Sequence, residues 1–582
     1  MIGRNAWLRR TCLLGAMAAA LVSGLGGLPG GGGGTYAQQS PAADEAKRKQ
    51  DQRRSFQSQE LTTAARFGWL FNPATPPRII WRDADELRNL GLHQPLRVRW
   101  FDAAANEASR PNASGRWVAW IEGTAPNGTP LRRALTFYAL PKSLPLHGAP
   151  EVSIVLPPAP GTLSPEVWRE HHAELSGTIK DLVLRSILDS QSGAVLAGGL
   201  AEWKPLGRPA RAVESAAVLD EDYHLALKLK LQGLHKQVRA IAPPRRRQSP
   251  ATALRPGTCT EAGMRPDAKA KIQAVCREWA KDTGDPMVTL VARRGVIVVY
   301  EAFGNDAAGK PVTLDYRCDA ASITKTVTAL LFSRFLDQGL IELDDPVGKF
   351  FPDYPRHDSH VPTFRQCFNH TSGLSGHGDF GGCRNPQFEN VVLNGIDVNQ
   401  PGVKYMYSGM GFDLAVKALE IVAGRSAVRL YDEILFRPLG FNDVPIDGAA
   451  AGGRFTAMEL GVLAQLVANR GSYGQWEVIS PATFAKLLPE PITVPQRGAI
   501  ADEGIGLHWV RHLKPGAPRN STLPEHLLFS PKTIGHGSLT GCILVVDPEQ
   551  QLVITQVRRQ SGARSLVWSP RFFQTIAAGM AE

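Results

Sequence analysis

The sequence Ala321-Ser322-Ile323-Thr324-Lys325-Thr326 carries the strongest indication of fold and chemistry in this chain. Apolar residues such as Val327 and Leu330 follow it, which predicts a buried helix. Serine and lysine three positions apart lie on one face of a helix, one turn from each other. The ammonium group of Lys325 can polarise the Ser322 hydroxyl, or the neutral amine can take its proton. The spacing therefore makes Ser322 a candidate nucleophile.

The Ser-x-x-Lys spacing is not specific by itself, because it occurs about once by chance in a chain of this length. In a purely structural interpretation, Ser322 caps the helix and the Lys325 ammonium group reaches solvent. In the catalytic interpretation, partial burial at the helix start favours the uncharged amine of Lys325. Other segments of the chain must decide between the two.

Two distant segments carry groups suited to the same reaction. The turn at 401–409 contains Tyr407, a phenol that acts as a base only where a nearby cation such as Lys325 stabilises its anion. The segment 535–541 reads Gly-His-Gly-Ser-Leu-Thr-Gly and precedes a predicted strand. Glycines allow close approach of a ligand, and backbone N–H groups at such an edge can stabilise an oxyanion. Singly, Tyr407 and His536 fit structural roles, but the ordered set indicates one site.

With these elements the sequence resembles the serine β-lactamase-related hydrolases, which include class C β-lactamases, D-Ala-D-Ala carboxypeptidases, D-aminopeptidases and family VIII esterases. The likeness covers about residues 260–580, over half of the chain. Besides the Ser-x-x-Lys tetrad it rests on Gly339-Leu340-Ile341-Glu342-Leu343-Asp344-Asp345-Pro346-Val347, Phe351-Pro352, Asn369-His370-Thr371-Ser372-Gly373-Leu374, Tyr405-Met406-Tyr407-Ser408, Arg437-Pro438-Leu439-Gly440-Phe441, Ala451-Gly452-Gly453 and His536-Gly537.

The resemblance implies an acyl-enzyme mechanism. Ser322 would be the nucleophile, Lys325 its activating partner and Tyr407 the general base and acid. His536 would occupy the place of the lysine in the family's Lys-Thr-Gly motif, and the N–H groups of Ser322 and Leu539 would form the oxyanion hole. Such hydrolysis needs neither a metal nor an organic cofactor. The substrate-binding and oxyanion residues implied are His536, Gly537, Ser538 and Leu539.

Two departures from the family pattern bear on the substrate. The family's Tyr-x-Asn reads Tyr407-Ser408-Gly409 here, and glycine has no side-chain amide to bind the carbonyl of a β-lactam or peptide. The Lys-Thr-Gly motif reads His536-Gly537-Ser538, which removes a fixed positive charge, although a shifted register would use Lys532. Both changes favour an esterase or an atypical amidase over a true β-lactamase or carboxypeptidase. A catalytically weak protein that binds peptidoglycan or another envelope ligand is the alternative.

Composition places the chain among ordinary globular proteins. It has 582 residues, of which 43% are hydrophobic and 20% charged, with a formal net charge of +11. This composition excludes a disordered or collagen-like chain, and the charge is too small for this length to indicate nucleic-acid binding. We expect a small-molecule or cell-wall peptide substrate as the partner.

The N-terminus predicts an export signal at 1–37. Arg4, Arg9 and Arg10 precede an apolar run at 12–22, and Thr35-Tyr36-Ala37 is a small-x-Ala cleavage site. The apolar run is short for a bilayer, so cleavage is favoured over an uncleaved anchor, leaving no membrane span. The pair of arginines is compatible with a twin-arginine signal as well as the general secretory route. The expected location is periplasmic or extracellular.

If the chain is exported, its cysteines can form disulfides that stabilise the fold. Six remain after cleavage, and an even number in an oxidising compartment suggests disulfides. The pairs closest in sequence are Cys259 with Cys276 and Cys367 with Cys383, although proximity in sequence does not establish pairing.

The remaining sequence divides into a leader, two domains and a linker. Residues 38–60 are polar and predict a flexible leader. Residues 61–241 predict an α+β domain without a recognisable motif, with strands at 96–101 and 116–121 and helices at 164–194 and 216–238. The Pro/Arg-rich stretch 242–257 predicts a linker. Its tripeptide Arg245-Arg246-Arg247 favours a solvated hinge over a site for anionic polymers.

Residues 258–582 predict one α/β domain of the β-lactamase/transpeptidase-like type. A helix at 267–281, a hairpin at 287–303, a second hairpin at 542–557 and a helix at 569–579 lie at its two ends, with a long helical region between them. Strands at both ends predict an antiparallel sheet with flanking helices and an all-helical insertion.

Other motifs are weaker. Residues 304–310 imitate a phosphate-binding loop but lack its Ser/Thr, because Pro311 stands there. His171 and His172 lack the spacing of a zinc protease, and His357 and His360 lie in a proline-flanked loop. We therefore expect no metal site.

Overall fold

The computed structural model describes residues 69–71, 78–83, 97–102, 106–113, 115–124, 130–139, 151–156, 225–226, 228–352, 354, 361–374, 382–384, 388–389, 392, 400–442, 444–446, 448–560 and 564–581. The predicted signal peptide, leader, helix at 164–194 and histidines 171, 172, 357 and 360 lie outside these residues. Among the helices described, none combines the length and hydropathy that a membrane span requires. The chain divides into two compact units, with the boundary at Gln232/Gly233 and a short piece, Pro386–Val398, that belongs to the first unit.

The first unit contains a five-stranded sheet in the order β1-β6-β5-β3-β4. The strands predicted at 96–101 and 116–121 are β3 and β5, which pair antiparallel. Trp100, Trp117 and Trp120 are buried, so these tryptophans belong to the core rather than to an exposed groove. The strands of this unit are β1 (Trp69–Phe71), β2 (Arg78–Asp83), β3 (Arg97–Asp102), β4 (Glu107–Ala108), β5 (Gly115–Thr124), β6 (Pro130–Ala139) and β7 (Glu151–Leu156), of which β2 and β7 form a separate parallel pair.

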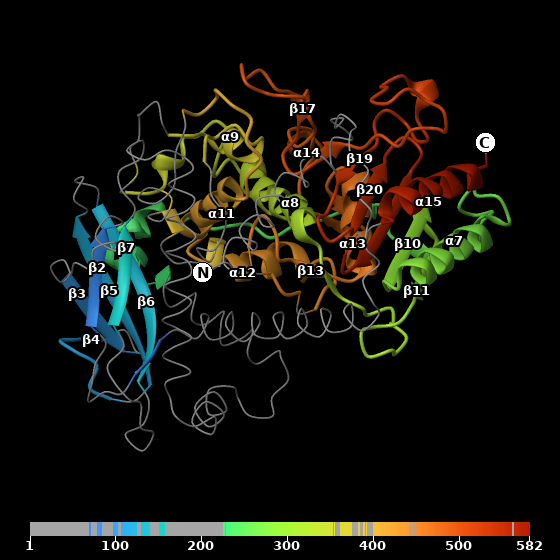
Figure 1. The fold of residues 1–582 in the computed structure, drawn as a ribbon. Helices are drawn as coiled ribbons and strands as arrows, with labels where there is room; N and C mark the ends of the chain where they lie inside the picture. Colours follow the sequence, from blue (N-terminus) through green and yellow to red (C-terminus); the bar gives the residue numbers. More distant parts are fainter. Residues whose placement is uncertain are drawn as a thin grey trace, which may run out of the picture. The chain divides into compact units, whose positions relative to one another are not determined.

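The second unit is built on a seven-stranded sheet in the order β18-β19-β20-β21-β10-β11-β9. Strands β19, β20, β10 and β11 of this sheet are labelled in Figure 1. The central pairing of β10 with β21 is antiparallel and joins the two ends of the domain, which confirms the predicted architecture. Only β9 pairs in parallel, with β11. The strands are β9 (Arg255–Pro256), β10 (Met287–Arg293), β11 (Val296–Phe303), β18 (His508–Trp509), β19 (Ile534–His536), β20 (Ile543–Asp547) and β21 (Leu552–Arg558).

The turn between β10 and β11 sets the pairing of the residues beside it, and the register shifts farther along, between Val291 and Ala292. Arg293 pairs with Val296, which leaves a two-residue loop of Arg294 (φ 53°) and Gly295 (φ 75°). Left-handed backbone at both loop residues matches the twist of a hairpin. A Cβ atom on Gly295 would lie 2.4 Å from Thr252 Cγ2, so this position also requires glycine for space.

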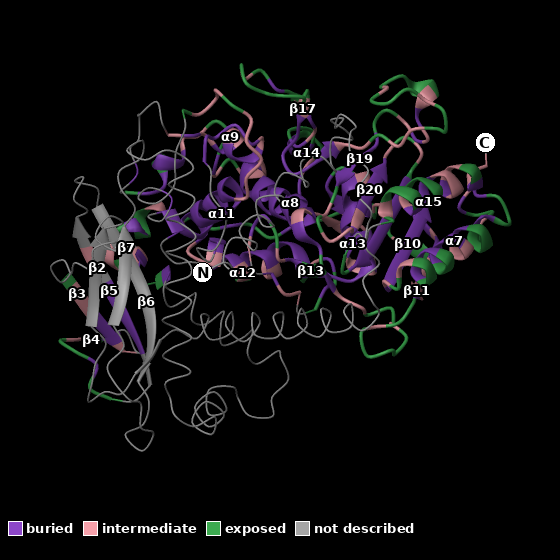
Figure 2. Cartoon of the chain, in the orientation of Figure 1, coloured by how far each residue is buried: buried purple, intermediate pink, exposed green. Residues whose placement is uncertain are grey.

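Helices cover both faces of the sheet. Met287 and Val291 of β10 pack in one cluster with α7 (Ala268–Thr283) and α15 (Ser565–Gly579), which contact each other. Leu290 points the other way, toward Gly461 of α13 (Ala457–Ala468). Figure 2 shows the strands buried between these helices. Alternating side chains along β10 thus enter two different cores, which explains why every residue of the strand is buried.

The closing helix α15 begins earlier than predicted. The sequence predicted a start near residue 569, yet the helix begins at Ser565 and contains Pro570, which cannot donate a backbone hydrogen bond. The missing bond affects the carbonyl of Leu566, a residue that is largely exposed, so water can replace the donor.

The helical insertion lies between the two hairpins in the sequence. Its buried helix α8 packs against α11. The remaining elements of the unit are α8 (Thr324–Asp337), α9 (Phe364–Phe368), α11 (Met410–Ala423), α12 (Ala427–Tyr431), α14 (Pro481–Ala485), β8 (Arg245–Arg246), β12 (Cys318–Asp319), β13 (Arg454–Phe455), β14 (Ser472–Tyr473), β15 (Trp476–Glu477), β16 (Glu490–Pro491) and β17 (Asp502–Glu503).

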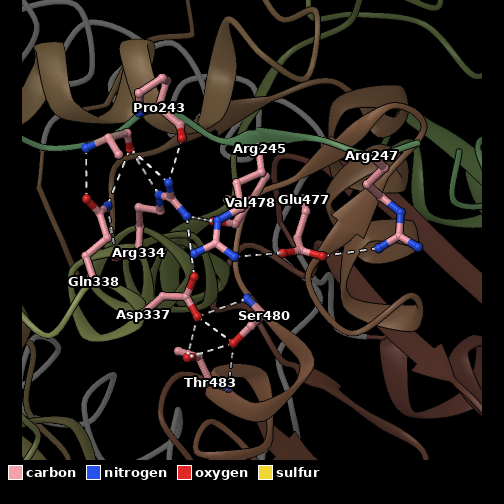
Figure 3. Close-up of polar contacts among 11 residues, drawn as sticks. Pro243, Arg245, Arg247, Arg334, Asp337, Gln338, Glu477, Val478, Ser480 and Thr483 are labelled. Atoms are coloured by element: carbon pink, nitrogen blue, oxygen red, sulfur yellow. Dashed lines mark hydrogen bonds and ion pairs between the residues drawn. The ribbon is translucent and has the colours of Figure 1, made fainter. Parts of the chain in front are cut away.

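The stretch 242–257, predicted as a solvated linker, is instead held against the second unit. Its strand β8 pairs with β15, and its strand β9 pairs with β11. The buried guanidinium of Arg334, near the end of α8, donates to the carbonyl oxygens of Ala242, Pro243 and Val478 and pairs with Asp337 (Figure 3). The prolines and arginines of this stretch disfavour a helix. Its extended backbone is ordered instead because the carbonyl oxygens of Ala242 and Pro243 accept hydrogen bonds from the buried Arg334 side chain.

Among the residues that the structure describes, the six cysteines that follow the predicted signal form no disulfide with one another, so neither Cys259–Cys276 nor Cys367–Cys383 is bonded. Cys276 faces the core from α7, where its thiol lies 3.7 Å from Thr289 Oγ1, while Cys259 is only half-buried. Burial raises the pKa of Cys276 to about 12. Sequence proximity failed as a guide because the helix directs Cys276 into the sheet instead of toward Cys259.

His512 provides a prediction for acid stability. Its ring stacks 3.6 Å from the ring of Phe573, and its Nε2 is shielded without a partner among the described residues. Burial lowers the pKa of His512 from 6.5 to about 3. The unfolded chain therefore binds an extra proton below pH 6.5, and the free energy of unfolding falls as the pH falls toward 3, by up to about 2 kcal/mol at pH 5. His512→Phe should reduce the difference between urea unfolding at pH 7 and pH 5 by this amount.

The control for this measurement is His235→Phe, because His235 is exposed and should leave the pH dependence unchanged. An equal pH 7 to pH 5 difference in wild type and His512→Phe would contradict the prediction.

Candidate active site

Ser322 lies in a tight turn that opens helix α8. Residues Ala321–Ile323 form a 3₁₀ turn, and α8 follows at Thr324. Ala321 has φ 43°, a strained value for a residue with a side chain, and its N–H donates to Asp319 Oδ1 at 2.7 Å. The strain and its compensating bond fix the backbone immediately before the candidate nucleophile, and the positive end of the α8 dipole lies at Ser322.

Lys325 is directed at Ser322 from one helical turn away, as its spacing predicts. Its Nζ lies 3.3 Å from Ser322 Oγ and donates to the Ala450 carbonyl at 3.0 Å. Only 3% of the residue is exposed, so the ammonium group does not reach solvent. Nζ also lies 4.7 Å from the centre of the Tyr407 ring, a cation–π distance. The alternative in which Lys325 extends to the surface is thereby excluded.

Tyr407 reaches the same serine from a segment 85 positions away. Its hydroxyl lies 3.0 Å from Ser322 Oγ. The ring packs 4.3 Å from the ring of His370, whose Nδ1 accepts from the Ser408 N–H and whose carbonyl accepts from the Met406 N–H. Burial, followed by the nearby positive charges of Lys325 and His508, lowers the pKa of His370, which keeps Nδ1 free to accept. His370 therefore positions Tyr407.

Gly409 leaves no room for the asparagine that the family pattern has at this position. It precedes α11 directly, and a Cβ atom there would lie 2.7 Å from the Ala450 Cβ. Ala450 also supplies the carbonyl that holds Lys325. The absence of a side-chain amide is thus built into the packing around the site rather than being a neutral change.

The predicted substrate-binding segment follows strand β19. Thr540 Oγ1 donates to the Asp319 carbonyl at 2.7 Å and lies 2.6 Å from Ser538 Oγ. This bond ties the segment that contains Gly537, Ser538 and Leu539 to the chain just before Ser322, as a shared oxyanion hole requires. Leu539 is 44% exposed, which leaves its backbone accessible to a ligand. A Cβ on Gly535 would lie 2.1 Å from Leu544 O, so β19 needs glycine there.

His536 is enclosed by protein groups. It is 2% exposed, its Nδ1 lies 2.6 Å from the Gly537 carbonyl and its Nε2 lies 3.0 Å from Nε2 of His508. Burial, and then the positive charges of His508 and Lys325, lowers the pKa of His536 well below its usual value, so the ring is neutral. It therefore does not replace the charge of the family's lysine. Neither His508 nor its partner Glu503 carries a sequence motif, and sequence reasoning missed both.

Within the described part of the chain, no group of three or more His, Cys, Asp or Glu side chains is arranged to hold a metal ion.

The arrangement defines a class of site: an antiparallel sheet beside a helix that presents serine and lysine one turn apart, with a tyrosine directed at the same hydroxyl. Residues 279–562 match the family model described as Beta-lactamase. The match shows that this part of the chain contains a domain of the Beta-lactamase type.

Curated relatives match over a limited region. The chain is 29% identical over 178 residues to "D-alanyl-D-alanine-carboxypeptidase/endopeptidase AmpH" of Escherichia coli (strain K12), covering 28% of this chain and 45% of that protein. It is 29% identical over 180 residues to "Esterase EstB" of Burkholderia gladioli, covering 27% of this chain and 45% of the relative. The chain thus spans less than half the length of these relatives. A solved family VIII carboxylesterase has 16% identity and a TM-score of 0.42, covering 54% of this chain and 98% of the other.

Proposed function

We propose that this protein is an exported serine hydrolase that cleaves an ester or amide through an acyl-Ser322 intermediate. The observation that carries the proposal is the convergence of two groups on one hydroxyl: Lys325 Nζ at 3.3 Å and Tyr407 Oη at 3.0 Å from Ser322 Oγ. A buried lysine and a tyrosine at such distances are suited to removing the serine proton during attack.

The reaction runs in two stages. Ser322 Oγ attacks the substrate carbonyl while its proton passes to Tyr407 as phenolate, which Lys325 stabilises, and the oxyanion is held by the N–H groups of Ser322 and Leu539. Tyr407 then gives the proton to the departing alcohol or amine. In the second stage a water attacks the acyl-serine, its proton passes through Tyr407 to Ser322 Oγ, and the acid is released.

The site favours esters over β-lactams and carboxylate-bearing peptides. Gly409 supplies no amide for a peptide carbonyl, and the packing against Ala450 leaves none possible. His536 is neutral, so it provides no fixed charge for a substrate carboxylate. The similarity to proteins named as an esterase and as a carboxypeptidase is compatible with either bond.

The test is intact-mass spectrometry after incubation with p-nitrophenyl esters, a fluorophosphonate and a panel of β-lactams, followed by peptide mapping. We expect the acyl or phosphonyl mass on the peptide that contains Ser322, none in Ser322→Ala, and little turnover of a chromogenic cephalosporin. Equal labelling of Ser322→Ala and wild type would refute the assignment. Rapid cephalosporin turnover would show a β-lactamase instead.

The second candidate is a catalytically weak protein that binds peptidoglycan or another envelope ligand, which the loss of the family's amide at Gly409 favours. Retention on peptidoglycan by a protein with no measurable hydrolysis and no covalent adduct would establish it.

A further inference from the structure

A chain of hydrogen bonds runs behind the substrate-binding segment and is not part of the acyl-transfer machinery. The Tyr405 hydroxyl donates to Glu503 Oε2 at 2.8 Å, and Glu503 Oε1 lies 2.9 Å from Nδ1 of His508. Nε2 of His508 lies 3.0 Å from Nε2 of His536, whose Nδ1 lies 2.6 Å from the Gly537 carbonyl. Four side chains from three parts of the sequence thus connect in a line.

The end of the line fixes where each hydrogen lies. The Gly537 carbonyl can only accept, so Nδ1 of His536 must carry a hydrogen. Since the His536 ring is neutral, its Nε2 is bare and accepts from Nε2–H of His508. At the other end, Tyr405 already donates to Glu503, and the remaining carboxylate oxygen accepts from Nδ1–H of His508. His508 therefore carries hydrogen on both nitrogens and is an imidazolium paired with a carboxylate.

The surroundings fit this assignment. The Glu503 and His508 side chains are 2% and 10% exposed, and a carboxylate buried to that extent requires a charged or donating partner at each oxygen. Burial, and then the charge of Glu503, raises the pKa of Tyr405, so its phenol stays protonated and donates. The other titratable groups near His508 are His370 and, beyond His536, Lys325; the pKa of His370 is lowered, partly by His508.

We propose that Glu503 and His508 are positioning residues that lock His536 in its Nδ1–H form and so hold the Gly537 peptide group and the oxyanion segment that follows it. His536 anchors one side of the segment through the Gly537 carbonyl, and Thr540 anchors the other side through the Asp319 carbonyl. The backbone between them carries Leu539 N–H. The role in catalysis rests on the proposed hydrolase function.

The hydrogen positions are measured in the resting full-length protein. Long-range ¹H–¹⁵N spectra of ring-¹⁵N-histidine-labelled protein should show both nitrogens of His508 protonated and His536 as a neutral Nδ1–H ring, with assignment by difference from His508→Leu. In Glu503→Gln, the amide can donate to Nδ1 of His508 while its oxygen accepts from Tyr405, so His508 should become neutral and retain Nε2–H. A wild-type His536 protonated at Nε2, or a neutral wild-type His508, would overturn the proposal.

A second experiment measures kcat and KM for hydrolysis of a p-nitrophenyl ester by variants of Glu503 and His508. His508→Leu and Glu503→Leu should lower kcat about ten- to hundredfold with KM nearly unchanged, because the oxyanion donor is displaced rather than removed. Glu503→Gln preserves the direction of every hydrogen bond that reaches His536 and should stay within about threefold of wild type. A Glu503→Gln protein as slow as Glu503→Leu would overturn the positioning role.

Different results would refute the hydrolase function and the positioning role of Glu503 and His508. The nitrogen spectra do not depend on turnover, so they report on the hydrogen-bond line even if no substrate is hydrolysed. Hydrolysis that persists in Ser322→Ala would refute the hydrolase assignment without changing the histidine spectra.

Discussion

Lys325→Met is expected to lower kcat/KM for ester hydrolysis by at least about a thousandfold while leaving the fold intact. Methionine fills nearly the same volume in the buried space that Lys325 occupies, but it removes the amine 3.3 Å from Ser322 Oγ. It also removes the cation 4.7 Å from the Tyr407 ring, which stabilises the phenolate. Ser322 would then have no activated base within reach.

The measurement is the rate of p-nitrophenyl ester hydrolysis, with the rate of fluorophosphonate labelling as a second readout and urea unfolding as a check of the fold. Lys349→Met is the matched control, because it makes the same substitution at a half-exposed lysine that pairs with Asp345 at the surface and is not near Ser322 in the proposed site. We expect it to stay within about twofold of wild type. Similar rates for Lys325→Met and Lys349→Met would remove Lys325 from the mechanism.

The proximity of Lys325 to Ser322 and the two terminal hairpins could be predicted from the sequence, because they depend on local periodicity. Ser322 and Lys325 are one helical turn apart, so their contact follows from the helix alone. The β10–β11 turn is fixed by Arg294 and Gly295, two neighbours in the chain. The contact of Tyr407 with Ser322 is different in kind: it spans 85 positions and could be inferred only through the resemblance to a family.

What could not be predicted depends on side chains that meet through the tertiary fold. Glu503 and His508 have no diagnostic spacing, and they become a pair only because β17 lies against β18, which itself pairs with β19. The clash that excludes a side chain at Gly409 arises from Ala450, which lies in a distant loop. Composition also misjudged residues 242–257, because a segment rich in proline and arginine can be ordered by acceptors on its backbone.

That ordered segment provides the second large effect. Arg334→Met is expected to lower the free energy of unfolding of the second unit by about 3–5 kcal/mol. The guanidinium is buried, donates to the carbonyl oxygens of Ala242, Pro243 and Val478, and pairs with Asp337. Without it, the carbonyl of the buried Val478 loses its side-chain donor, and the carbonyl groups of Ala242 and Pro243 lose the bonds that hold them against α8. Asp337 keeps its bonds from Ser480 and Thr483, so the loss concentrates on the 242–243 backbone.

Limited trypsin digestion distinguishes release of this segment from global unfolding. Arg245, Arg246 and Arg247 are exposed but held by β8–β15 pairing and by Glu477. A protease needs locally unfolded chain, so Arg334→Met should be cut there faster than wild type under conditions where the rest of the unit stays intact. Gln338→Ala is the control, since Gln338 also bonds Ala242 but at the exposed edge of the network, and it should cost under about 1 kcal/mol. Equal cleavage of Arg334→Met and Gln338→Ala would mean that β-pairing alone holds the segment and that Arg334 does not.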